Sequence, residues 1–198
     1  MRLGILGGCF DPIHIGHILV AQDVLFKLKL SRIIFVPSFS PPHRPPPITP
    51  YHHRVKMVQL AIKYNPRFKL SQIEKDRTGP SYTVDTLRQF RRVLPKAYLY
   101  FILGYDQYRT VESWHNPEEL TQLAKIVVIS RPKISRPRLF PEHESRRVIF
   151  LDVIPVAVSA QLIRERLAKD KSIRYLVTTE VAEYIYRHRL YRVNRDKN

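Results

Sequence analysis

Apolar residues along the chain fall into short continuous runs that alternate with stretches of helical spacing. The short runs predict buried strands at 3–6, 33–36, 68–73, 98–103, 126–129 and 148–152. Helical spacing predicts helices at 18–26, 51–64, about 83–93, 114–124, 158–169 and 178–189. Because strands that alternate with helices form parallel sheets, the pattern predicts an α/β fold. We expect a mostly parallel sheet with helices on both faces and a small helical part at the C-terminal end.

The length of 198 residues is that of one domain of ordinary size. We therefore expect a single domain over 1–198, with a C-terminal helical subdomain at about 159–191. Residues 37–50 hold seven prolines, which exclude a helix or a central strand. This loop follows a predicted strand, where the binding loops of α/β sheets lie. The basic insert 131–147 receives no assignment.

The composition indicates in which compartment the protein works and what kind of partner it binds. A single cysteine excludes an intramolecular disulfide framework and favours a reducing compartment, which we expect to be the cytoplasm. Apolar runs are too short to cross a bilayer, so no membrane partner is expected. The 34 Lys and Arg against 17 Asp and Glu give a formal net charge of +17. This charge raises nucleic-acid binding as an alternative and equally suits an enzyme with phosphate substrates.

Residues 7–17, GGCFDPIHIGH, join a predicted strand to a predicted helix. Glycines let backbone N–H groups approach a ligand, and a helix start attracts anions. His14 and His17 are three residues apart, so they share a face of the opening turn. We therefore predict a site for a nucleotide phosphate. The alternatives are a structural turn with two surface histidines and a zinc pair, but zinc usually requires three or four ligands.

Read as GGxFDPxHxGH, this stretch resembles the signature of the HxGH nucleotidyltransferase superfamily. The superfamily includes cytidylyltransferases, phosphopantetheine adenylyltransferases and mononucleotide adenylyltransferases. The resemblance implies catalytic roles for His14 and His17. It implies ATP binding by Gly7, Gly8, Cys9, Phe10, Gly16 and His17, although the family more often has Thr or Ser at the position of the cysteine.

Two further segments resemble bacterial nicotinate-nucleotide adenylyltransferases. PSFSPPHR at 37–44 is similar to their PxxxPPHK/R loop, and EKDRTGPSYTVDTL at 74–87 is similar to their ELxRxGPSYTxDTL segment. In the second segment, Ser81 or Thr83 is also expected to cap the helix that follows. The resemblance implies that nicotinate mononucleotide is bound by His43, Arg44, Ser81, Tyr82, Thr83 and Thr86.

A third segment, FILGYDQYRTVESW at 101–114, resembles the FIxGxDxxxxxxxW pattern of the same family. The resemblance implies ATP binding by Gly104 and Asp106, with the carboxylate of Asp106 on the ribose. It also implies that Trp114 stacks on the pyridine ring of the mononucleotide. The next residue, His115, is expected in the same site, although the family often has Tyr there.

Two C-terminal segments extend the resemblance over nearly the whole chain. In VSAQLIR at 158–164, Ser159 is expected to cap the helix that begins there. The same segment is similar to the ISSTxIR segment of the family. It implies ATP binding by Ser159 and Arg164 and a catalytic role for Arg164 on the leaving pyrophosphate, with Gln161 in place of the family's Thr. The ending at 184–191 is similar to the C-terminal YIxxxxLY pattern.

Together these segments imply a Rossmann-like enzyme of NAD biosynthesis that transfers AMP from ATP to nicotinate mononucleotide. The products would be nicotinate adenine dinucleotide and pyrophosphate. The partners would be ATP and nicotinate mononucleotide, and the cofactor Mg²⁺ would be held mainly by phosphate oxygens and water. Because a phosphate monoester with a second pKa of about 6 is largely dianionic at neutral pH, no general base is required. Catalysis would rest on positioning and charge stabilisation.

Three other functions remain open from the sequence. The nearest is the same transfer to nicotinamide mononucleotide, or a dual specificity. The next is a different reaction of the superfamily, which the segments at 74–87 and 101–114 argue against. The last is a basic nucleic-acid-binding protein, although a specific nucleic-acid partner is not favoured. A homo-oligomer is also left open.

Overall fold

The computed structural model describes residues 1–42, 46–130, 139–141, 143 and 145–192. Its strands are β1 (Arg2–Gly8), β2 (Arg32–Pro37), β3 (Phe68–Leu70), β4 (Tyr98–Gly104), β5 (Lys125–Ser130) and β6 (Val148–Asp152). Its α-helices are α1 (Ile15–Lys27), α2 (Tyr51–Ile62), α3 (Thr83–Val93), α4 (Tyr105–Tyr108), α5 (Leu120–Leu123), α6 (Ala160–Ala168) and α7 (Thr179–Arg187). Short 3₁₀ turns are η1 (Val111–Ser113), η2 (Pro117–Glu119) and η3 (Ser145–Arg147).

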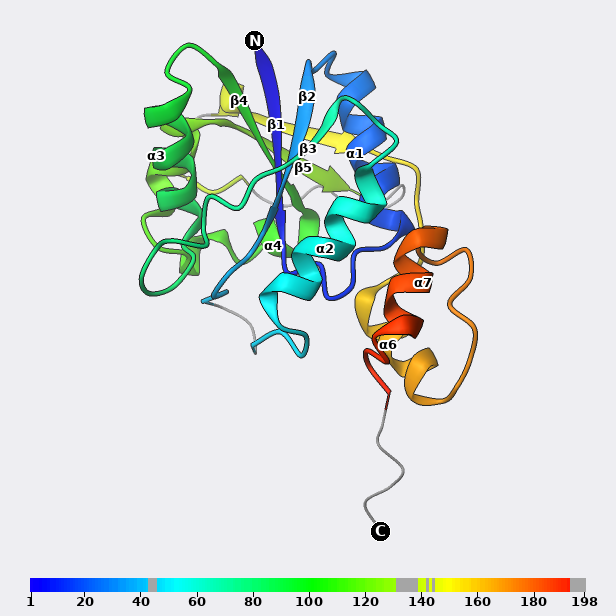
Figure 1. The fold of residues 1–198 in the computed structure, drawn as a ribbon. Helices are drawn as coiled ribbons and strands as arrows, with labels where there is room; N and C mark the ends of the chain where they lie inside the picture. The colour runs from blue at the N-terminus through cyan, green and yellow to red at the C-terminus, as the bar shows by residue number, and fades with distance from the viewer. Residues whose placement is uncertain (43–45, 131–138, 142, 144, 193–198) are drawn as a thin grey trace.

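The strands form one sheet in the order β3-β2-β1-β4-β5-β6, and each neighbouring pair is parallel. The chain therefore builds outward from β1 on one side and then from β4 on the other (Figure 1). The predicted Rossmann-like α/β fold is confirmed. In such sheets a ligand binds outside the carboxyl ends of the strands where the order reverses, which here is between β1 and β4.

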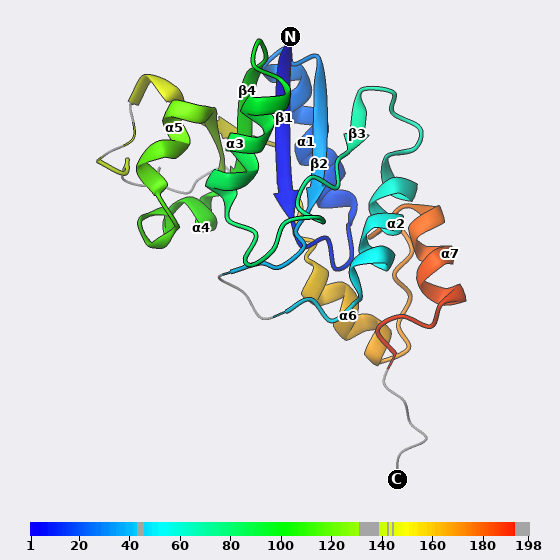
Figure 2. The ribbon, with the colours of Figure 1, turned by 60° about the vertical axis from the view of Figure 1, so that its left-hand side comes forward.

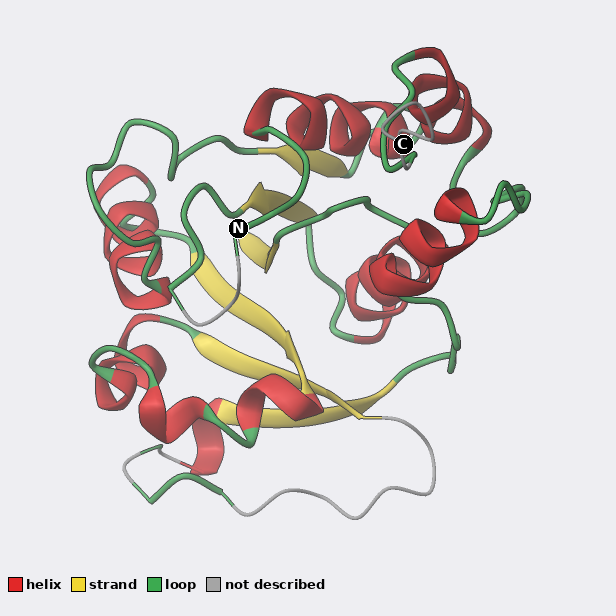
Figure 3. Cartoon of the chain, turned by 90° about the horizontal axis from the view of Figure 1, so that it is seen from below, coloured by secondary structure: helices red, strands yellow, loops and turns green. Residues whose placement is uncertain are grey.

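Two apolar layers cover the sheet, and β1 contributes to both. Leu3 and Ile5 face the layer packed by α3, α4 and α5, whereas Leu6 faces the layer packed by α1 and α2. Figures 2 and 3 show helices on both faces of the sheet. Alternate residues of a strand point to opposite faces, so this short apolar run is buried on both sides.

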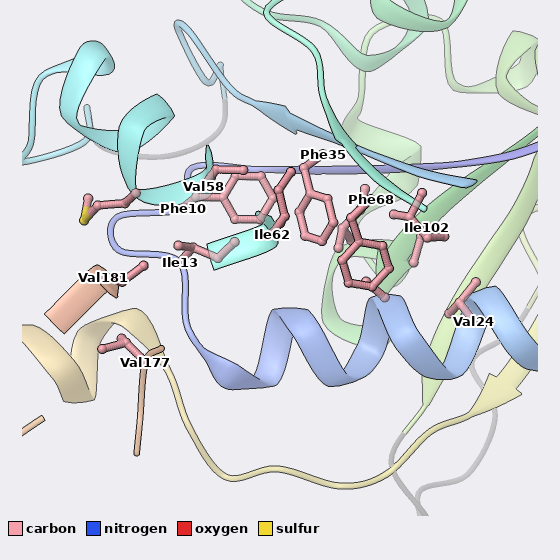
Figure 4. Packing of buried hydrophobic residues seen from close by; sticks show 14 of the residues in the cluster. Phe10, Ile13, Val24, Phe35, Val58, Ile62, Phe68, Ile102, Val177 and Val181 are labelled. Atoms are coloured by element: carbon pink, nitrogen blue, oxygen red, sulfur yellow. The ribbon is translucent and has the colours of Figure 1, made fainter. Parts of the chain in front are cut away.

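The C-terminal helices lie near the carboxyl ends of the strands, where α7 packs against α2 (Figures 1 and 2). Their apolar side chains belong to the same core cluster as residues of the turn between β1 and α1. Figure 4 shows Ile13 of that turn close to Val177 and Val181. The C-terminal part of the chain is thus packed directly against the segment that carries the two histidines.

Three local predictions differ from the structure. β3 ends at Leu70 rather than at residue 73, and it pairs only with β2 at the sheet edge. The predicted helix at 114–124 is replaced by the 3₁₀ turn η2 and the short helix α5, because Asn116 has a left-handed φ of 46° and is followed by Pro117. Neither predicted cap of α3 is used: its N-cap is Tyr82, without a side-chain hydrogen bond.

The predicted N-cap of α6 is confirmed, since Oγ of Ser159 accepts a hydrogen bond of 3.1 Å from the N–H of Leu162. Within the described ranges, no helix combines the length and apolarity that a membrane span requires.

Candidate active site

The turn between β1 and α1 is held in place by two side chains that point into the core. Phe10 and Ile13 are almost completely buried, with 2% and 0% of their surface exposed. Phe10 was expected among the ATP-binding residues, but its ring packs in the core and meets the ring of His17 edge-on, 5.1 Å between centroids. The side chain of Phe10 therefore packs between the core and the ring of His17.

The two histidine rings of the turn lie against each other, with centroids 3.7 Å apart. His14 is the N-cap residue of α1 and is buried, and burial lowers its pKa from 6.5 to about 4. It is therefore neutral at physiological pH. Its Nδ1 is buried and has no hydrogen-bond partner among the described residues. Buried polar atoms without a partner are uncommon in folded proteins.

Gly16 allows the ring of His14 to lie close to the start of α1. A Cβ on this glycine would stand 3.0 Å from Nδ1 and 3.1 Å from Cε1 of His14, tighter than ordinary contact. The same Cβ would lie 3.8 Å from the carbonyl oxygen of Val158, one residue before the N-cap of α6. The starts of α1 and α6, both predicted to bind phosphates, are therefore neighbours.

Backbone and side-chain groups at these helix starts are partly engaged within the protein. The N–H of Ile15, first residue of α1, donates to the carbonyl of Leu176 at 2.9 Å. This amide is thus not offered to an anion, contrary to the simplest reading of a helix start. Arg164 is half-buried, and its Nη1 donates to the carbonyl of Asp11 at 2.8 Å. The guanidinium therefore lies beside the turn that carries the histidines.

A pocket of about 250 Å³ opens beside this turn, at the carboxyl ends of β1, β2 and β4. It lies where the strand order reverses, the place at which such sheets bind ligands. Ten of the predicted site residues line it: Gly7, Gly8, Cys9, Ser81, Tyr82, Thr83, Thr86, Asp106, Trp114 and His115. Segments from the first half and the middle of the chain thus meet in one cavity.

Other predicted site residues lie outside the lining of this pocket. They are Phe10, His14, Gly16, His17, Gly104, Ser159 and Arg164. Gly104 is the N-cap of α4 and places Asp106, which is exposed, in the first turn of that helix. His43 and Arg44 lie outside the described residues. The predicted site therefore has two adjoining parts, a pocket and a pair of helix starts, joined through residues 7–17.

Aromatic rings line the side of the pocket expected to bind the mononucleotide. Tyr82 and His115 stack at 4.4 Å between centroids with an interplanar angle of 28°. Trp114 is half-buried and meets Phe101 edge-on at 6.5 Å. These flat apolar surfaces suit an aromatic ring of a ligand.

A buried polar network that includes the pocket-lining residues Glu74, Ser81 and Thr86 was not predicted from the sequence. The hydroxyl of Thr86 donates to Oε1 of Glu74 at 2.7 Å and accepts from Nη2 of Arg77 at 3.1 Å. Oγ of Ser81 accepts from the N–H of Ser40 at 3.0 Å. Ser81 does not cap α3, because the helix begins at Thr83 and its N-cap is Tyr82. The network ties the start of α3 to the loop after β2. The signal was present, since Glu74 and Arg77 belong to the quoted segment 74–87.

Arg54 is a second residue whose role the sequence did not reveal. It lies on α2 with 2% of its surface exposed, and it donates to the carbonyls of Cys9 at 2.7 Å, Ser38 at 2.8 Å and Thr49 at 3.1 Å. It therefore links the loops that follow β1 and β2. Its position three residues before the buried Met57 on one helix face was the available signal.

In the part of the chain that the structure describes, no three His, Cys, Asp or Glu side chains stand where they could hold a metal ion. A metal ion that accompanies a nucleotide does not need such a group, because Mg²⁺ keeps several waters and binds phosphate oxygens.

The geometry defines a nucleotide-binding α/β protein, and comparison with known proteins identifies its family. A family profile described as cytidylyltransferase-like matches residues 5–166. A protein of Thermus thermophilus named probable nicotinate-nucleotide adenylyltransferase is 44% identical over 97% of this chain and 100% of the relative. One of the same name from Thermomicrobium roseum is 43% identical over 96% of this chain and 92% of the relative. The chain thus belongs to the cytidylyltransferase-like family and, within it, to the nicotinate-nucleotide adenylyltransferases.

A solved structure shares the fold at lower sequence identity. It is the nicotinic acid mononucleotide adenylyltransferase of Plasmodium falciparum complexed with NaAD, with a TM-score of 0.78 and 21% identity. The alignment covers 96% of this chain and 97% of that one.

Proposed function

We propose that the chain transfers the AMP group of ATP to the phosphate of nicotinate mononucleotide. This reaction is the step of NAD biosynthesis that the sequence led us to expect. The observation that carries the proposal is the pocket at the reversal of strand order. In it the turn after β1, Asp106 and the aromatic rings of Tyr82, Trp114 and His115 face one cavity. These are the parts needed for a nucleotide ribose, its phosphates and a pyridine ring. The names of the relatives support the same substrate.

The reaction joins a phosphate oxygen of the mononucleotide to the α-phosphorus of ATP. The bond from that phosphorus to the oxygen of the β-phosphate breaks, and pyrophosphate leaves with its electrons. Since the attacking phosphate is largely dianionic at neutral pH, the site has to supply position and positive charge rather than a base. In our proposal His17 donates a hydrogen bond to the α-phosphate, His14 contributes a neutral ring beside it, and Arg164 faces the leaving pyrophosphate.

We propose Mg²⁺ as the divalent cofactor, held by phosphate oxygens and water. Bound in this way, it would neutralise part of the negative charge of the triphosphate. The proposal is supported by the nucleotidyltransferase family to which the chain belongs, which suggests a requirement for a divalent metal ion.

We also propose that residues 1–198 act as one nucleotidyltransferase domain in the cytoplasm. One apolar cluster contains both Leu6 of β1 and Ile185 of α7, which supports a common core for the sheet and the C-terminal helices. The single cysteine supports a reducing compartment.

The test is pyrophosphate release with ATP and Mg²⁺, compared for nicotinate mononucleotide, nicotinamide mononucleotide and phosphopantetheine. We expect a strong preference for the first. Equal use of both pyridine nucleotides would support the adenylyl transfer but contradict the preference for the nicotinate form. His115 would then be the residue to examine. Release with phosphopantetheine alone, or with none of the three, would overturn the proposal.

A further inference from the structure

The turn between β1 and α1 is fastened by three groups from the C-terminal part of the chain. Nη1 of Arg164 donates to the carbonyl of Asp11 at 2.8 Å, and the carbonyl of Leu176 accepts from the N–H of Ile15 at 2.9 Å. The hydroxyl of Tyr191 donates to Oδ1 of Asp11 at 2.7 Å, across 180 positions of sequence. Because these contacts converge on residues 11–15, the C-terminal end of the chain helps to define where His14 stands.

Asp11 is the centre of this arrangement. Its carboxylate is buried, with 5% of the residue exposed, so it requires hydrogen-bond donors. Oδ2 accepts from the N–H of Ile48 at 2.8 Å and from the N–H of Thr49 at 3.4 Å, while Oδ1 accepts from Tyr191. One carboxylate therefore joins the histidine turn, the loop before α2 and the segment after α7.

Tyr191 is built into this position. It is half-buried at a turn after α7, with a φ of 64°, and packs against the core cluster that contains Ile13. Burial and the neighbouring charge of Asp11 raise the pKa of the Tyr191 hydroxyl above its usual value of 10.0. The hydroxyl thus remains a donor through the neutral and alkaline range.

We propose that Tyr191 is a positioning residue for nucleotidyl transfer, which it serves by holding Asp11 and, through it, the histidine turn. The inference rests on the proposed function. Tyr191 lies outside the lining of the pocket, whereas Asp11 is only three residues from His14. Loss of its hydroxyl is therefore expected to lower kcat and to leave the KM for nicotinate mononucleotide nearly unchanged.

The test compares Tyr191→Phe with Tyr184→Phe. Tyr184 lies on α7, and its hydroxyl forms a hydrogen bond of 2.8 Å with Nδ1 of His53. Tyr184→Phe therefore removes one hydroxyl contact from the C-terminal part of the chain, as Tyr191→Phe does, but no contact to Asp11. For Tyr191→Phe we expect kcat to fall about 10- to 100-fold, the scale of a small misplacement of reacting groups, with KM within about two-fold. For Tyr184→Phe we expect both constants to remain near those of the unmodified protein.

A second measurement does not depend on activity. Amide hydrogen exchange of Ile48 and Thr49 reports the bonds to Oδ2 of Asp11, and that of Ile15 reports the start of α1. Exchange at these amides should be faster in Tyr191→Phe than in Tyr184→Phe. Equal exchange in the two variants, unchanged kcat in Tyr191→Phe or an equal fall of kcat in both would each overturn the inference. If the unmodified protein does not use nicotinate mononucleotide, the proposed function fails, and the exchange comparison still decides whether Tyr191 holds the turn.

Discussion

The backbone N–H of His14 donates a hydrogen bond of 3.2 Å to Nδ1 of His17. Since Nδ1 accepts, the neutral ring of His17 must carry its proton on Nε2. The turn thereby fixes one tautomer and leaves the other nitrogen of the ring as a donor. A donor at that position is what a phosphate oxygen requires.

Substitutions of His17 can separate its two nitrogens. In His17→Asn the amide oxygen lies close to the position of Nδ1, so it can still cap the start of α1 by accepting the hydrogen bond from the N–H of His14. The donor at Nε2 is lost. We expect pyrophosphate release to fall at least about 100-fold, the usual effect of removing one donor that stabilises a transition state. In His17→Ala we expect the same loss and, in addition, a loss of about 1 kcal/mol in the free energy of unfolding, because the cap is removed too.

The matched variant is His17→Gln. Its side chain is longer than that of Asn, so its amide nitrogen can take the place of the Nε2 donor. It should retain more turnover than His17→Asn, and steady-state kinetics with urea unfolding would measure both effects. Normal turnover in His17→Asn would contradict the assigned role.

Arg54 is expected to be needed for stability as well as for the shape of the pocket. Its replacement by Met would leave the buried carbonyls of Cys9, Ser38 and Thr49 without this donor. Unsatisfied buried groups cost about 1–3 kcal/mol each, so we expect Arg54→Met to lower the free energy of unfolding by about 3 kcal/mol or more. Arg88→Met is the control, since that side chain is 38% exposed and forms surface ion pairs worth at most about 1 kcal/mol. Equal losses in the two variants, measured by urea denaturation, would contradict this account.

Burial of His14 predicts a loss of stability in acid. Its pKa of about 4 in the folded protein lies below the unfolded value of 6.5, so between these values the unfolded state binds more protons. The contribution to stability is present above pH 6.5 and declines as the pH falls toward 4. The loss of unfolding free energy between pH 7 and pH 5 amounts to about 2 kcal/mol. The drop in unfolding free energy over that interval should be smaller by this amount in His14→Asn than in the unmodified protein. An identical drop would show that His14 does not titrate in this way.

The sequence predicted those features that depend on neighbouring residues. The apolar runs at 3–6 and 98–103 were sufficient to place β1 and β4, because a strand buried on both faces needs only a continuous apolar stretch. Ser159 could be predicted as an N-cap because its hydrogen-bond partner, Leu162, is only three residues away in the sequence. The helix expected at 114–124 was wrong because the pattern of apolar residues outweighed the Asn-Pro step near its start.

Contacts between distant segments were not predicted. Asp11 and Tyr191 each belong to a quoted motif, but their hydrogen bond joins the two ends of the chain and depends on how α7 packs against α2. The bonds of Arg54 to main-chain carbonyls were hidden for a further reason, because any residue supplies a carbonyl and no pattern marks it. Such contacts become visible only once the fold places the loops together.

Trp114 offers a direct optical test of the pocket. It is the only tryptophan of the chain and lines the cavity beside Phe101, so its emission reports on that site. If the pyridine ring stacks on the indole, nicotinate mononucleotide should quench the emission in a saturable manner. Ribose 5-phosphate, which lacks the ring, should quench little at the same occupancy, and Trp114→Phe should weaken binding of the mononucleotide by about 1 kcal/mol or more. Equal quenching by the two compounds would show that the indole responds to the phosphate end or to a general closing of the site. The ring would then have to bind elsewhere in the cavity, where the stacked pair of Tyr82 and His115 offers another aromatic surface.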